Sequence, residues 1–85
     1  MKKILYLHGL DSCAPEDKMR AIIKAHNTAF VVSPHIDYRL SPDCIFDELF
    51  KLAESIKPDL IIGSSMGGRV GYYIAKKLGC DVILF

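Results

Sequence analysis

The chain has 85 residues, of which 51% are hydrophobic and 25% charged, and its formal net charge is +1. This length allows one small domain, and the scattered charges exclude the clustered basic surface of a nucleic-acid-binding protein or a membrane-binding helix. No apolar run approaches the ~18 residues that a membrane-spanning helix needs.

The three cysteines, Cys13, Cys44 and Cys80, are odd in number and far apart. Without a C-x-x-C pair they indicate neither a zinc site nor a disulfide framework, and reduced thiols are typical of a cytosolic protein. The apolar run near the N-terminus is too short for a signal peptide and has no small-residue cleavage site after it. We therefore expect a cytoplasmic protein that needs no metal and no cofactor.

The first predicted elements are a strand, a helix and a second strand. Residues 4–7 form a compact apolar run that ends before His8 and Gly9, which is typical of a buried strand. Over residues 15–26 the apolar side chains recur at helical spacing, and a proline suits the first turn. Residues 30–32 predict the second strand.

Two further helix–strand pairs follow along the chain. Ser41 can cap a helix that has Pro42 at its first position, and Gly79 can end the later helix in a left-handed conformation. The predicted elements are helices over residues 42–56 and 67–78 and strands over residues 60–62 and 82–85.

Short apolar strands that alternate with helices predict an α/β fold, a parallel sheet with helices on both faces. With right-handed crossovers, we expect one domain over residues 1–85 with the strand order 2-1-3-4. Ligands of such sheets bind beyond the carboxyl ends of the strands, where the order reverses. The loops that contain His8-Gly9-Leu10 and Ser64-Ser65 therefore meet at the predicted site.

A glycine-rich serine motif follows the third predicted strand. It reads Gly63-Ser64-Ser65-Met66-Gly67 and fits the pattern G-x-S-x-G. In this motif the central serine occupies a strained strand-to-helix turn, and small neighbours prevent a clash there. The Ser65 hydroxyl is thereby exposed, and the N–H of Met66 can stabilise the oxyanion that forms when Ser65 attacks an ester carbonyl. The pattern predicts a nucleophile elbow.

Two other glycine motifs do not fit these segments. A phosphate-binding P-loop requires Gly-Lys-Ser/Thr after its spacer, whereas this chain has Gly68-Arg69-Val70. The dinucleotide-binding fingerprint is absent, because the first strand is followed by a lone Gly9. A tight turn without a ligand is the remaining alternative for the serine motif. Gly9 itself permits close backbone approach, and the N–H of Leu10 can be a second oxyanion donor.

The chain resembles the α/β-hydrolase superfamily in residues 5–12 (LYLHGLDS), in Pro34 and Pro42, and in residues 62–68 (IGSSMGG). It is most similar to the small bacterial YqiA-like (UPF0227) predicted esterases. The resemblance covers nearly all 85 residues and corresponds to the superfamily's third to sixth strands. It implies Ser65 as the catalytic nucleophile, Leu10 and Met66 as the oxyanion hole, and a supporting motif of His8, Gly9, Gly63 and Gly67.

In this superfamily the acid and the base of the catalytic triad follow the next two strands, past Phe85. The resemblance therefore implies a C-terminally incomplete domain. Among the histidines present, His8 has a structural role in the family and His26 is expected near the opposite end of the sheet. His35 is expected at the catalytic edge, but the first strand separates it from Ser65, and a base must lie within hydrogen-bond reach. A solvated loop histidine is the favoured interpretation and a surrogate base the alternative.

Four further side chains, two near the predicted site and two on the third predicted helix, have structural interpretations. We expect Asp11 and Asp37 to be turn carboxylates, and Tyr72 and Tyr73 to pack against the sheet.

The resemblance implies a carboxylic-ester hydrolase, an esterase or thioesterase acting on a small acyl-ester or thioester substrate. The alternative is a truncated, non-catalytic hydrolase fragment or interaction module, since a fold alone does not fix a function. Nucleic acids and membranes are not expected partners. The last strand is apolar on both faces, and we expect self-association through its edge.

Overall fold

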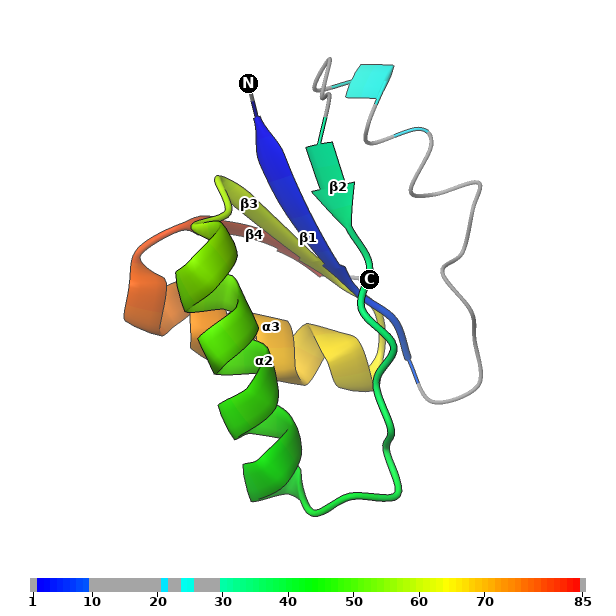
Figure 1. Cartoon of the computed structure of the whole chain (residues 1–85). Coiled ribbons are helices and arrows are strands. Elements are labelled where there is room, and N and C mark those ends of the chain that lie inside the picture. The colour runs from blue at the N-terminus through cyan, green and yellow to red at the C-terminus, as the bar shows by residue number, and fades with distance from the viewer. Residues whose placement is uncertain (1, 10–20, 22–23, 26–29, 85) are drawn as a thin grey trace.

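The computed structural model describes residues 2–9, 21, 24–25 and 30–84. Strands and helices alternate after the first two strands, and two helices lie beside one sheet (Figure 1). The elements are β1 (Lys3–Leu7), β2 (Phe30–Val32), α2 (Pro42–Ile56), β3 (Leu60–Gly63), α3 (Met66–Leu78) and β4 (Asp81–Leu84).

The four strands form one parallel sheet in the order β2-β1-β3-β4, which confirms the predicted α/β fold and strand order. Ile4 of β1 is in register with Val31 of β2 and with Leu60 of β3. Ile61 of β3 is in register with Val82 of β4. Because all strands run the same way, their carboxyl ends share one edge of the sheet, and the order reverses between β1 and β3.

Helix α2 begins and ends where the sequence predicts. The hydroxyl of its N-cap Ser41 accepts a hydrogen bond of 3.3 Å from the N–H of Cys44, and Pro42 follows at the first turn. Lys57 ends the helix in the left-handed region with φ 55°. The buried face of α2 comprises Ile45, Leu49 and Ala53.

The two faces of the sheet have different cores. Helices α2 and α3 both lie on one face of the sheet (Figure 1). Their apolar residues pack there against side chains such as Leu5 and Ile61. On the other face Ile4, Tyr6 and Ile62 are fully buried. The buried Tyr6 hydroxyl on this second face makes no hydrogen bond of normal geometry among the described residues. Burial raises the pKa of the phenol, and the nearby Ser64 side chain opposes this with a smaller lowering effect.

The predicted helix over residues 15–26 lies mostly outside the described residues. Of its positions only Ala21, Lys24 and Ala25 are described, and all three are helical. A helix that covers the second face of the sheet therefore stays a prediction.

Helix α3 approaches the sheet closely through small residues, and this corrects one expectation. A Cβ atom at Gly71 would lie 3.0 Å from Cγ2 of Ile61. Tyr72 and Tyr73 are 45% and 60% exposed, and their rings contact each other edge to face instead of packing on the sheet. The expectation was wrong because Gly71 and Ile74 occupy the helix positions that face the sheet.

Neither α2 nor α3 has the dimensions of a transmembrane segment. They contain 15 and 13 residues, and a spanning helix needs about 20 apolar residues. In the part of the chain that the structure describes, no helix is both long and apolar enough to cross a bilayer.

Candidate active site

Ser65 lies in the turn between β3 and α3, at the carboxyl edge of the sheet. Its φ of 55° and ψ of −120° form a sparsely populated combination for a residue with a side chain. The residue is exposed, and its hydroxyl makes no capping hydrogen bond to α3. The turn therefore presents a free hydroxyl on a strained backbone at a helix N-terminus.

Glycines make this turn possible because the backbone approaches itself too closely for side chains. A Cβ atom at Gly67 would overlap the carbonyl oxygen of Leu7 and lie 2.6 Å from that of His8. A Cβ atom at Gly63 would overlap the Cα of Gly68. Real Cβ atoms essentially never come within 3.0 Å of such neighbours, so both positions require glycine. The first turn of α3 is thus pressed onto the end of β1.

At the start of α3, one backbone N–H group is already hydrogen-bonded and another is not. The N–H of Gly67 donates to the Ser64 carbonyl over 3.0 Å. The N–H of Met66 makes no hydrogen bond within the described residues, so it can donate to an oxyanion formed beside Ser65. The other predicted donor, Leu10, lies outside the described residues.

The end of β1 lies directly against the serine turn. The N–H of Ser64 donates to the Leu7 carbonyl over 3.0 Å. A Cβ atom at Gly9 would lie 3.0 Å from the Cβ of Ser65 and 3.7 Å from its Oγ. The structure therefore brings together the two loops that the strand order predicts to meet, and Gly9 permits this approach.

Hydrogen bonds engage both ring nitrogens of His8. The N–H of Ile36 donates to Nε2 over 3.2 Å, and Nδ1 lies 2.8 Å from the Gly9 carbonyl oxygen. Because Nε2 accepts, the neutral ring carries its proton on Nδ1 and donates it to Gly9. The hydroxyl of Tyr38 donates to the His8 carbonyl. His8 therefore orders the loop and has no free nitrogen to accept a proton from Ser65.

No local sequence pattern indicates that Ile36 and Tyr38 form hydrogen bonds with His8. Both residues lie in the segment between β2 and α2. Ile36 is 28 residues and Tyr38 is 30 residues away from His8 along the chain. Only the pairing of β1 with β2 brings this segment to the end of β1. A contact made by the fold in this way leaves no periodicity or motif in the sequence.

Replacing His8 by alanine is expected to lower the free energy of unfolding by about 1–3 kcal/mol, because the N–H of buried Ile36 loses its acceptor. Urea denaturation followed by circular dichroism would measure this loss. The matched control is His35→Ala, since His35 is exposed and a surface change of this kind costs less than about 0.5 kcal/mol. Equal losses in the two variants would contradict a structural role for His8.

The other candidate acids and bases have separate positions. The His35 ring lies 6.3 Å from the His8 ring, centre to centre, and is exposed. Asp37 pairs with Arg39 at 2.9 Å, and hydrogen bonds from Arg39 lower the pKa of that carboxyl from 3.8 to about 2. Asp37 is thus a turn carboxylate that stays ionised. Asp11 and His26 lie outside the described residues.

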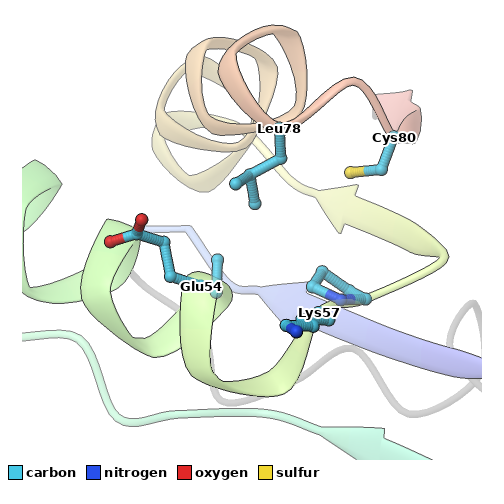
Figure 2. Close-up of a pocket in the computed structure, with 6 residues that line it drawn as sticks. Glu54, Lys57, Leu78 and Cys80 are labelled. Carbon is cyan, nitrogen blue, oxygen red and sulfur yellow. The ribbon is translucent and has the colours of Figure 1, made fainter.

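A recess lies at the far end of α3, away from Ser65. It has a volume of ≈ 280 Å³, with Glu54 and Lys57 on the α2 side and Leu78 and Cys80 on the α3 side (Figure 2). Burial raises the pKa of the Cys80 thiol, which keeps it protonated and weakly nucleophilic at neutral pH. Among the described residues no group of three or more His, Cys, Asp or Glu side chains could hold a metal ion. Neither observation gives this recess a chemical role.

Comparisons with known proteins add one match. The model of the family described as "Uncharacterised protein family (UPF0227)" matches residues 3–85. The matched range contains every strand and helix given above. A search of curated proteins found no match.

Proposed function

The chain belongs to the UPF0227 family, and we propose that it is a serine hydrolase of the α/β-hydrolase type with Ser65 as its nucleophile. The observation that carries the proposal is the backbone of Ser65, an exposed non-glycine residue held at φ 55° and ψ −120°, outside the ordinary left-handed helical region. It lies in a turn that tolerates no side chain at Gly63 or Gly67. Strain of this kind persists only where the surrounding structure enforces it, and it is concentrated at functional sites. An activated serine attacks the acyl carbon of carboxylic esters and thioesters, among other acyl compounds, and we propose an ester or thioester of a small acyl group as the substrate.

The proposed reaction proceeds in two steps. Ser65 Oγ forms a bond to the acyl carbon while its proton passes to a base, and the bond from that carbon to the alcohol or thiol leaving group breaks. The base then returns the proton to the leaving group, and water releases the acid by the reverse route. The Met66 N–H stabilises the negative oxygen in both steps, and Leu10 is the second proposed donor.

The base is the component for which the described residues offer no candidate. Both nitrogens of His8 are engaged, and no hydrogen bond joins His35 to Ser65 within the described part of the chain. This observation favours the alternative function, an interaction module that keeps the hydrolase turn without turnover. Chemical rescue of the missing base distinguishes the two functions.

The 85-residue chain alone is expected to hydrolyse p-nitrophenyl butyrate at close to the buffer rate, because a serine hydroxyl is a poor nucleophile without a base. Added imidazole, a free base of the same chemistry as histidine, should produce a rate increase that depends on Ser65. The Ser65→Ala chain, assayed at each imidazole concentration, subtracts the catalysis by imidazole itself.

Identical rates for the two chains at every imidazole concentration would count against a hydrolase and favour the interaction module. Fast hydrolysis without imidazole that disappears in Ser65→Ala would show instead that the chain supplies its own base. In that case His35→Ala tests the surrogate.

A further inference from the structure

A small apolar recess lies between the N-terminal turns of α2 and α3 and the segment that precedes α2. Its volume is ≈ 170 Å³, and no charged side chain lines it. The lining residues are Tyr38, Leu40, Pro42, Ile45, Met66 and Val70. Leu40 and Met66 are 42% and 37% exposed, so large apolar side chains stand open to solvent at this place.

The recess adjoins the proposed catalytic turn on two sides. Met66 follows Ser65 directly, and its N–H is one of the two proposed oxyanion donors. Tyr38 donates its hydroxyl hydrogen bond to the carbonyl of His8, next to Gly9, which packs against Ser65. Met66 therefore connects the recess to the proposed oxyanion position, although Ser65 itself does not line the recess.

We infer that this recess is the acyl pocket of the proposed hydrolase and that it takes a short unbranched acyl chain of about six carbons, since a cavity of ~150 Å³ accommodates benzene. The inference rests on the proposed function. The apolar lining excludes a charged acyl group, because nothing in the recess would replace the water lost by the charge.

The neighbouring spaces limit the length of the chain. A groove of ≈ 350 Å³ shares Pro42, Met66 and Val70 with the recess but adds the charged side chains of Asp43 and Arg69. An acyl chain longer than the recess would enter this groove, where burial of further methylene groups against solvated charges gains little.

On the other side of α3, Ser65 lines a space of ≈ 300 Å³ together with Arg69, Tyr72 and Leu84. This space is the competing location for an acyl chain, and the experiment must distinguish it from the recess.

Unbranched primary amides mimic the acyl group and are not turned over, so they report binding alone. We would titrate acetamide, butanamide, hexanamide and octanamide into the methyl-labelled full chain and follow Leu40, Ile45 and Val70 by NMR. The dissociation constant should fall about fourfold per methylene group up to hexanamide and then stay level, since each buried methylene contributes ~0.8 kcal/mol. Shifts confined to Leu84, or affinity that still rises at octanamide, would overturn the inference.

Two matched variants place the ligand. Leu40→Trp fills the recess from an exposed loop position and should weaken hexanamide binding by about tenfold or more. Leu84→Trp adds the same bulk on the far side of α3 and should leave binding within about twofold. The reverse pattern would assign the acyl chain to the space beside Tyr72. Hexanamide binding without Ser65-dependent hydrolysis would overturn the proposed function alone, whereas hydrolysis without binding would overturn this inference alone.

Discussion

Gly67→Val is expected to lower the free energy of unfolding by about 4 kcal/mol or more, a large share of the ~4–13 kcal/mol typical of a chain this size. A Cβ atom at this position overlaps the Leu7 carbonyl oxygen and lies 2.6 Å from that of His8. These atoms belong to or adjoin β1, which is paired with strands on both sides and cannot shift to make room. Urea denaturation would show the loss directly.

Substitutions at Ser65 are the matched controls for Gly67→Val. Ser65→Ala removes one exposed hydroxyl and should change stability by less than about 0.5 kcal/mol. Ser65→Gly should raise stability by about 1 kcal/mol, because glycine adopts φ 55° without the strain that serine suffers. Equal melting temperatures for Gly67→Val and Ser65→Ala would mean that the turn is not the nucleophile elbow proposed above.

The purified chain is expected to self-associate through β4. Among the described strands β4 pairs only with β3, so its other edge presents unpaired N–H and C=O groups. Val82 and Ile83 are half-buried, and Leu84 is 50% exposed. An apolar strand edge of this kind is a template for pairing with a second copy. An apparent molar mass from light scattering that increases with protein concentration would reveal the association.

Charged substitutions test whether β4 is the contact. Ile83→Lys should restore a monomer, since lysine on an edge strand opposes pairing. Because Ile83 packs against the second core, Leu84→Lys at an exposed position is the companion variant that leaves the core intact. A monodisperse monomer for the unsubstituted chain would rule out this edge as an interface.

The elements that the sequence predicts correctly are those with local signals. Continuous apolar runs mark all four strands, and Ser41 with Pro42 marks the start of α2. The strand order follows because right-handed crossovers leave few arrangements for alternating strands and helices. The strained turn at Ser65 was also predictable, since the motif itself states which positions must be glycine.

The contacts that the sequence misses are made by the tertiary fold. Tyr38 reaches the His8 carbonyl only because β2 pairs with β1, and nothing around residue 38 indicates this. The exposed positions of Tyr72 and Tyr73 depend on the rotation of α3 about its axis, which the sequence pattern of the helix did not reveal. The apolar recess is formed by the segment before α2, the start of α2 and the start of α3. It is therefore visible only after the tertiary fold has brought these three segments together.

The position of β1 in the sheet also has a consequence for synthesis of the chain. β1 is translated before β3, which is one of its two neighbours in the sheet. Lys3 and Asp59 are joined by hydrogen bonds of 2.8 and 2.9 Å across 56 residues of sequence. Ribosomes add ~5–20 residues per second, so roughly 3–12 s pass before β3 exists. During that interval one edge of a strand with four consecutive buried residues, Ile4 to Leu7, is open in the nascent chain. Closing so long a loop also slows folding after release.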